Sequence, residues 1–197
     1  MDLDDRSGPS ETVSGRPDAR PARPARPPAM TSAAVLRAAD AESLSTGRHH
    51  LRLLLDSSGT GGAVSTHRVL LRAGAEGAAP HRHVTTTELF FVLAGRVDVL
   101  TGEDVVQVSE GDLVVVPPGC DHAFGATAGV DGELLVVVTP GVQRFDFFRA
   151  VHEVATGEAD RSILAGTEEL YDNHAASALA TEGWRSCRPR PTGGDRS

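Results

Sequence analysis

Three histidines and one glutamate in the middle of the chain have the residue types and spacing of a metal site. The stretch HRHVTTTELFFVLAG places His81 and His83 two residues apart and Glu88 five residues further on. Alternate side chains of a β-strand point to the same face, so the two imidazoles can be presented to one point. His122 follows a β-rich run and a Pro-Pro-Gly turn, on a candidate neighbouring strand. Three imidazoles and a carboxylate are a complete donor set for one divalent transition metal.

Glu88 has two candidate roles at such a site. It either holds the metal as a ligand only, or it leaves the metal and takes a proton from a bound enol or phenol as a general base. Three histidines and one carboxylate would leave about two positions of an octahedral metal open for a substrate. The spacing does not choose between the two roles, so Glu88 is both a candidate ligand and the candidate catalytic residue.

The elements that would position these residues are short strands. Apolar and polar residues alternate in β-rich runs such as HHLRLLLD, ELFFVLAG, RVDVLTG and ELLVVVTPG, which end at Gly, Pro or Asp. Such runs at close spacing are typical of a β-sandwich or barrel. The segment TGED, residues 101–104, is predicted to be a hairpin connection in which Gly102 supplies the backbone freedom of the turn.

The period changes to that of a helix after Gly141. Five apolar residues of VQRFDFFRAVHEVATG recur at helical spacing and predict an amphipathic helix packed against the barrel. These residues are Val142, Phe145, Phe148, Val151 and Ala155. A weaker helical pattern covers residues 165–183.

The two ends of the chain differ from its body in composition. Residues 1–30 contain six prolines and five arginines, and too few apolar side chains to offset the entropy of ordering, so we predict that they are disordered. Met30 is a candidate alternative translation start, and a linker or anchoring arm is the competing interpretation. Residues 185–197 are predicted to be a disordered tail. The body then divides into a β-barrel over residues 31–141 and a helical segment over residues 142–184.

The charge and hydropathy of the chain exclude several classes of protein. Residues 31–184 carry 10 arginines and 21 acidic residues, a net charge of −11, whereas a nucleic-acid surface needs a basic stripe. No apolar run approaches the ~20 residues of a membrane span, and the first residues lack the apolar stretch of a secretory signal. Cys120 and Cys187 lack the spacing of a disulfide framework or a zinc site. We therefore expect a soluble, cytoplasmic protein that binds neither nucleic acid nor membrane.

These residues resemble the two motifs of the cupin superfamily. The first motif is matched from His81 through Gly95, and GDLVVVPPGCDH matches the second from Gly111 through His122. The leading glycine of the first motif and the closing asparagine of the second are absent here, but neither is a ligand position. The resemblance covers about residues 50–140. It implies an all-β fold, a double-stranded β-helix or jelly-roll barrel, with the C-terminal helices packed outside.

The same resemblance implies a function for the four residues. His81, His83, Glu88 and His122 would hold one divalent transition metal: iron, manganese, nickel, cobalt or copper, with zinc as a further candidate. The segment LLVVVTPGVQRFDFFRAV also resembles the small cupins related to quercetin dioxygenase. This second resemblance implies a dioxygenase of a phenolic or enolic small molecule, with molecular oxygen as co-substrate.

Two alternatives to the dioxygenase remain open from the sequence. One is a non-redox cupin, such as a cyclase, isomerase or decarboxylase, and the other is a small-molecule-binding cupin without catalysis. Small cupin barrels usually pair through exposed strands, so we expect a homodimer.

Several other residues could belong either to the site or to the packing around it. Phe90 shares strand parity with Glu88, and Phe124 shares it with His122, so each faces a cavity beside the metal or belongs to the core, which is the favoured interpretation. Cys120 is expected to be inert. The remaining histidines lack ligand-like spacing with one another: His49, His50, His67, His152 and His174. His152 falls on the predicted helix after Phe148 and is expected to be a packing or surface residue.

Overall fold

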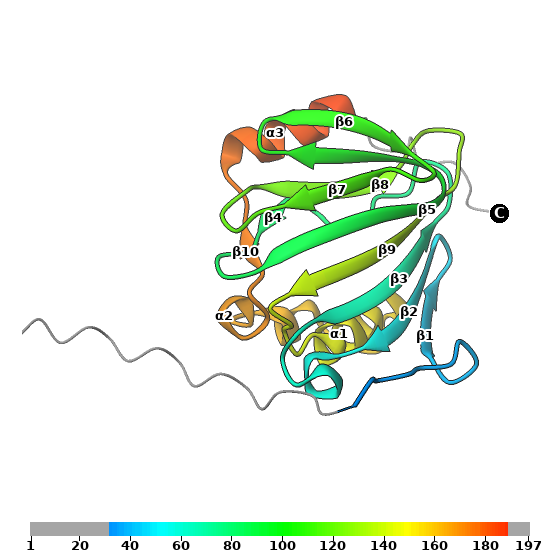
Figure 1. Cartoon of the computed structure of the whole chain (residues 1–197). Coiled ribbons are helices and arrows are strands. Elements are labelled where there is room, and N and C mark those ends of the chain that lie inside the picture. The colour runs from blue at the N-terminus through cyan, green and yellow to red at the C-terminus, as the bar shows by residue number, and fades with distance from the viewer. Residues whose placement is uncertain (1–31, 189–197) are drawn as a thin grey trace, which may run out of the picture.

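The protein folds as antiparallel β-strands in two layers, with helices outside them (Figure 1). The computed structural model describes residues 32–188, so the predicted disorder of residues 1–30 and of most of the tail lies outside the described residues. The strands are β1 (Glu42–Thr46), β2 (His49–Leu55), β3 (Ser65–Leu71), β4 (His81–Arg82), β5 (Thr87–Thr101), β6 (Asp104–Ser109), β7 (Leu113–Val116), β8 (His122–Ala126), β9 (Gly132–Thr139) and β10 (His174–Ala175). The helices are α1 (Phe145–Thr156), α2 (Glu168–Tyr171) and α3 (Ala178–Cys187), with 3-10 turns η1 (Ser57–Thr60) and η2 (Arg161–Leu164). The predicted all-β class with C-terminal helices is confirmed.

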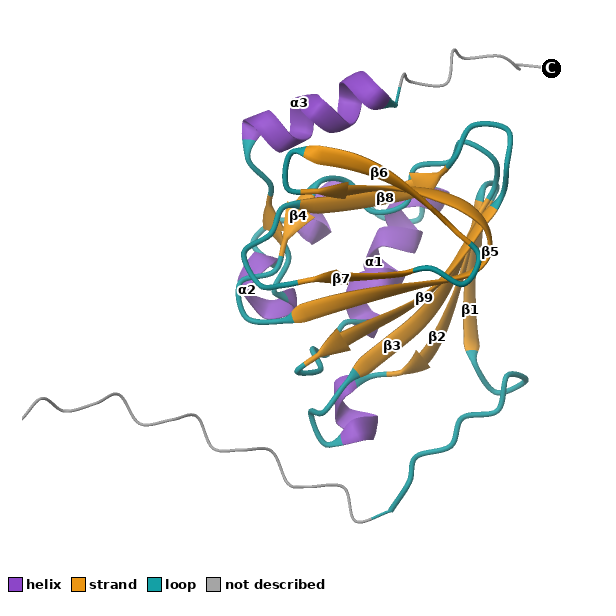
Figure 2. Ribbon diagram, turned by 45° about the horizontal axis from the view of Figure 1, so that its top comes forward, coloured by secondary structure: helices purple, strands orange, loops and turns teal. Residues whose placement is uncertain are grey.

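The long strand β5 belongs to both layers. Its first half pairs with β7 and β9, and its second half pairs with β6 and β8. One layer therefore runs β1-β2-β3-β9-β5-β7 and the other β6-β5-β8-β4-β10, and Figure 2 shows them diverging from β5. The sequence predicted two strands in this region. The structure instead has one strand. A bulge between Val92 and Ala94 and the left-handed backbone of Gly95 bend this strand, but its pairing with neighbouring strands continues past them.

The hydrophobic core lies between the two layers. Strand β9 alternates buried and half-buried residues along its whole length, as period-two patterning requires. Phe90 is fully buried and Phe124 is 6% exposed, and the two rings lie 5.1 Å apart. The favoured interpretation of both residues as core is therefore confirmed. The predicted turn at Gly102 is also present, since Thr101 pairs with Asp104 across it.

Helix α1 begins at Phe145 because Asp56 binds its N-terminus. The two carboxylate oxygens of Asp56 accept hydrogen bonds from the backbone N–H groups of Arg144, at 2.9 Å, and Phe145, at 3.1 Å. Phe148 is half-buried on the predicted face. Val151 is 38% exposed, so its assignment to that face is wrong. The reason is that α1 packs against β1, the edge strand of its layer, and η2 rather than across a sheet.

The segment predicted as a weak helix over residues 165–183 is three elements. The chain forms the short α2, leaves the helical conformation at Asp172, whose φ is 47°, and then pairs with β4 as β10. Helix α3 follows, packs against β6 and buries Trp184 to 2% exposure. It continues through Cys187, beyond the predicted boundary at residue 184. Within residues 32–188, no helix is long and apolar enough to cross a membrane.

Replacement of Gly95 by alanine tests the bend of β5. Gly95 and Gly102 share a φ of 71°, but a Cβ on Gly95 would lie 1.8 Å from the carbonyl oxygen of Asp131, whereas a Cβ on Gly102 meets no atom within 4 Å. We expect Gly102→Ala to lower the free energy of unfolding by about 1 kcal/mol. Gly95→Ala should lower it by about 3 kcal/mol or more, because the backbone must also move. Urea denaturation measures both, and equal losses would contradict the steric argument.

Candidate metal centre

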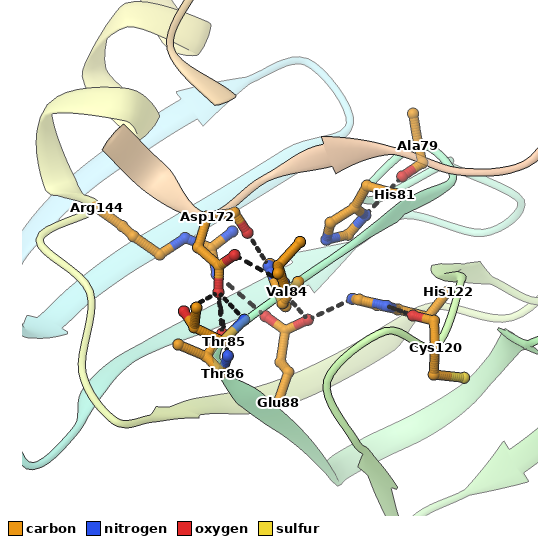
Figure 3. A network of polar contacts seen from close by, with 11 residues as sticks. Ala79, His81, Val84, Thr85, Thr86, Glu88, Cys120, His122, Arg144 and Asp172 are labelled. Atoms are coloured by element: carbon orange, nitrogen blue, oxygen red, sulfur yellow. Dashed lines mark hydrogen bonds and ion pairs between the residues drawn. The ribbon is translucent and has the colours of Figure 1, made fainter. Parts of the chain in front are cut away.

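The structure brings the four predicted ligands together in the interior. Figure 3 shows His81, Glu88 and His122 turned towards one another. His81 lies on β4 and His83 just after it, while Glu88 lies near the start of β5 and His122 begins β8. Their donor atoms all lie within 4.8 Å of one another. None of the four residues is more than 8% exposed.

Strand pairing explains how residues so far apart in sequence meet. His81 and His122 are direct partners in the antiparallel pair of β4 and β8, and their ring centroids are 4.1 Å apart. Glu88 pairs with Val116 at the end of β7, immediately before the Pro-Pro-Gly turn that leads to His122. That turn is tied to the site by a 2.7 Å hydrogen bond from the backbone N–H of Gly119 to the carbonyl oxygen of His83.

Each of the three imidazoles is oriented by a backbone carbonyl. Nδ1 of His81 lies 2.8 Å from the carbonyl oxygen of Ala79. Nδ1 of His122 lies 2.9 Å from the carbonyl oxygen of Cys120. Nδ1 of His83 contacts the carbonyl oxygen of Asp172. A carbonyl can only accept, so each Nδ1 carries a proton and donates it. In the neutral ring the Nε2 atom then carries a lone pair, which is the arrangement of histidines that bind metals.

The ionisation of the site follows from burial and from the contacts between its members. Burial alone would raise the pKa of Glu88, but its contacts with His122 and His83 and the charge of Arg144 outweigh this effect and hold that pKa well below its usual value. Burial and the neighbouring His122 hold the pKa of His81 well below its usual value. The carboxylate is therefore charged and the His81 imidazole neutral at neutral pH.

The donor set fits a divalent transition metal. Oε2 of Glu88 lies 2.9 Å from Nε2 of His122 and 3.3 Å from Nε2 of His83, so each of these contacts needs a proton or a cation between its two atoms. Buried acceptors without a donor are costly. A shared proton would satisfy one ring at a time, whereas a divalent cation would satisfy all four donors.

A buried aspartate from the C-terminal segment supports the centre. The carboxylate of Asp172 accepts hydrogen bonds from three backbone N–H groups, of Val84 at 2.7 Å and of Thr85 and Thr86 at 3.1 Å each, and from both threonine hydroxyls. Although burial would raise the pKa of Asp172, these bonds lower it to about 2. The loop between His83 and the strand that carries the carboxylate ligand is thus held by Asp172, which sequence reasoning missed because no local spacing marks it.

Two further residues beside the centre were missed or underrated. Arg144, 5% exposed, donates from an NH group to Oε1 of Glu88 at 3.4 Å. His67, which the sequence set aside because it lacks ligand-like spacing, is 6% exposed and faces the interior from β3. Burial, followed by the charge of Arg144, lowers its pKa to about 3. Strand parity with Val69 and Leu71 could have indicated the inward position of His67, but no sequence pattern marks Arg144.

The other residues considered in the sequence lie outside the donor set. Cys120 is half-buried, and its thiol faces the carbonyl oxygen of Asp121 at 3.6 Å, so its contribution to the centre is the backbone oxygen that orients His122. The remaining histidines outside the set are His49, His50, His152 and His174.

Replacement of Asp172 by asparagine tests the support of the centre. The amide keeps the shape of the side chain but loses its charge and one acceptor, so the loop at residues 84–86 and the carbonyl that orients His83 should loosen. We expect the affinity for the metal to fall about 10- to 100-fold. Asp160→Asn is the matched control, since Asp160 is an exposed helix cap in the same C-terminal segment. Competition against a chromophoric chelator measures both affinities, and an unchanged value in Asp172→Asn would contradict the assigned role.

Part of the chain matches a known protein family. Residues 67–138 match the family model described as Cupin domain (Cupin_2). No curated protein matches the sequence.

Several solved structures are similar to the chain at low sequence identity. The polyketide cyclase RemF from Streptomyces resistomycificus is 17% identical, with 55% of this chain and 80% of that chain covered and a TM-score of 0.47. A protein of Thermotoga maritima described as a predicted oxalate decarboxylase is 22% identical, with 54% and 98% covered and a TM-score of 0.48. The nucleoside dehydratase Pac13 of Streptomyces is 15% identical, with 55% and 83% covered and a TM-score of 0.44.

The residues that match the family model include the four donor residues. The matched residues run from β3 to β9 and contain all four donor residues of the centre. They exclude Arg144 and Asp172, which reach the centre from the C-terminal segment. Residues 67–138 thus match the Cupin domain model and contain a buried cluster of three histidines and one glutamate, in agreement with the two sequence motifs.

Proposed function

We propose that the chain is a metal-dependent enzyme that acts on a small organic molecule at the buried centre of its cupin domain. The observation that supports this function is the convergence of four buried electron-pair donors on one point. A divalent metal held there supplies a Lewis acid. His81, His83, Glu88 and His122 would hold it and leave about two octahedral positions for oxygen atoms of the substrate.

The proposed reaction is non-redox chemistry at a carbonyl, as in a cyclase, isomerase or decarboxylase. The fixed positive charge of Arg144 lies beside Glu88 at 3.4 Å and within the low-dielectric interior. Such a charge stabilises negative charge on a substrate held beside the donor set. His67 stays neutral near it and can donate a hydrogen bond to the same substrate.

Within this proposal, Glu88 holds the metal and does not act as the general base. Its pKa lies well below the usual value, which makes it a weak base near neutral pH. Both of its oxygens already have partners, since Oε2 faces His122 and His83 while Oε1 accepts from Arg144. Proton abstraction by Glu88 would first have to break these contacts.

The dioxygenase that the sequence predicts is the second candidate. It is favoured by the resemblance of residues 134–151 to the quercetin dioxygenase-like cupins and by a donor set that suits iron, nickel, copper or cobalt. The paired Phe147 and Phe148 of that resemblance lie at the start of α1, with ring centroids 5.8 Å apart. Under this alternative, a phenolic or enolic substrate reacts with molecular oxygen.

Metal analysis tests the centre itself. Protein purified without chelators should contain near-stoichiometric iron, manganese, nickel, cobalt, copper or zinc by inductively coupled plasma mass spectrometry. His83→Ala and Glu88→Gln should each lose most of this metal, because each removes one of four donors. His152→Ala, which removes the same ring from α1, should retain it. A wild type that stays empty after reconstitution would overturn the metalloenzyme proposal.

An oxygen electrode separates the two reaction classes with the same proteins. A panel of flavonols and 1,3-diketones is incubated with the metal-loaded protein, and substrate loss is followed by chromatography. The non-redox enzyme converts its substrate with no more oxygen uptake than the His83→Ala control. Oxygen uptake that matches substrate loss and disappears in His83→Ala would select the dioxygenase instead.

We also propose that two copies of the chain pair through β7. Among the described strands, β7 pairs only with β5, and its outward residues Leu113 and Val115 are 57% and 55% exposed. Phe91, the partner of Leu113 across the strands, is 40% exposed, and an apolar strand edge of this kind favours association. Light scattering should give about twice the mass of 20.6 kDa. Leu113→Lys should restore the monomer mass, whereas Leu179→Lys on α3 should not, and a monomeric wild type would refute the pairing.

A further inference from the structure

The buried guanidinium of Arg144 has fewer partners than its donors require. The side chain is 6% exposed, and its one hydrogen bond among residues 32–188 runs from an NH1 group to Oε1 of Glu88 at 3.4 Å. The Nε atom is buried without a partner in the same range, and the adjacent NH2 group makes no hydrogen bond there either. Phe148 lies under the guanidinium, 5.6 Å from it, and offers only its ring face.

A purely structural role does not account for this arrangement. Asp56 is the nearby candidate for an ion pair, but its carboxylate accepts from the backbone N–H groups of Ser57, Arg144 and Phe145 instead. Arg188, the other arginine that is buried within residues 32–188, shows what a structural guanidinium does in this fold. It donates to the carboxylate of Asp98 at 2.8 Å and to two backbone carbonyls through its NH groups, so that only its Nε, like that of Arg144, lacks a partner among these residues. A buried charge without comparable partners is costly, so its retention points to an external partner.

The free edge of Arg144 has the donor geometry for one kind of ligand. The Nε and NH2 groups form a planar two-donor edge, and this edge matches the two oxygens of a carboxylate. His67 lies beside it, with its ring 4.6 Å from that of Phe148, and makes no ring hydrogen bond among the described residues. The neutral imidazole therefore has a donor available next to the guanidinium.

The position of Arg144 relative to the donor set completes the argument. Glu88 contacts the arginine through Oε1 and the histidine nitrogens through Oε2, so one carboxylate separates the guanidinium from the metal position. A ligand held by Arg144 would therefore lie close to the four donor residues that would hold the metal. We propose that Arg144, assisted by His67, binds the carboxylate of a small carboxylic-acid substrate. A second oxygen atom of this substrate would bind at the metal centre, so the proposal rests on the proposed function.

Two classes of probe separate the arginine from the metal. Pyruvate, oxalate and salicylate carry a carboxylate, whereas acetohydroxamic acid is a neutral metal chelator. Isothermal titration calorimetry on the metal-loaded protein measures the dissociation constant of each. In Arg144→Met we expect the dissociation constant of at least one carboxylate to rise about tenfold or more, because a charge-assisted hydrogen bond is lost. The dissociation constant of acetohydroxamic acid should change by less than about twofold, since it does not use the arginine.

Matched variants exclude indirect effects. Arg149→Met removes the same charge from α1, but Arg149 pairs with Glu42 and Asp146 at the surface, so its dissociation constants should equal those of the wild type. Arg144→Lys keeps the charge without the planar edge and should also weaken carboxylate binding. His67→Phe keeps a ring against Phe148 and should weaken it by about threefold or more. Circular dichroism and metal content of each variant show whether it folds and loads.

Each outcome decides the proposal. Carboxylates that fail to bind the wild type, or that bind Arg144→Met as tightly, would overturn it, provided that acetohydroxamic acid shows a loaded centre. Should Arg144→Met fail to fold, Arg144→Lys and His67→Phe give the decision, and unchanged carboxylate binding in both would overturn the assignment. A protein that takes up no metal would overturn the proposed function instead. If the metal-free protein still binds carboxylates and Arg144→Met abolishes that binding, the role of Arg144 is supported. If the metal-free protein binds no carboxylate, the role of Arg144 is refuted.

Discussion

The structure depends on one unfavourable arrangement, four electron-pair donors that face one another inside an apolar barrel. Lone pairs on imidazole nitrogens and a charged carboxylate repel one another, and burial deprives them of water. Backbone carbonyls hold the Nδ1 protons of all three rings, and the Nε2 atoms of His83 and His122 face Glu88. A cation resolves the arrangement, and its binding energy would then add to the stability of the fold.

The support for this arrangement extends well beyond the residues that match the cupin family. Asp172 ties the loop after His83 to the C-terminal segment, and β10 continues the layer that carries His81. Asp56 holds the start of α1 and thereby places Arg144 beside Glu88. Residues 67–138 thus provide the four donor residues, while the segment after β9 provides groups around them.

Sequence reasoning located the ligands because their placement is local. His81 and His83 share a face through strand periodicity, and a short turn brings His122 opposite His81. The same reasoning missed Asp172 and Arg144, because their contacts with the centre join residues 89 and 56 positions apart in the chain. Nothing in the local pattern of a loop or a helix start encodes such a distance. The division of β5 into two strands failed for a related reason, since pairing with four neighbours outweighs the local break at Gly95.

The contact between Asp172 and His83 also has a consequence for the order in which the centre can be assembled during synthesis. All four ligands have left the ribosome once the chain has grown somewhat past His122, and strands β4, β5 and β8 can then pair. The carbonyl that orients His83 and the carboxylate that holds residues 84–86 are made considerably later. A nascent chain therefore passes through a stage in which its ligands are present but one of them is not yet oriented. Selection of the correct metal would belong to the finished protein rather than to the growing chain.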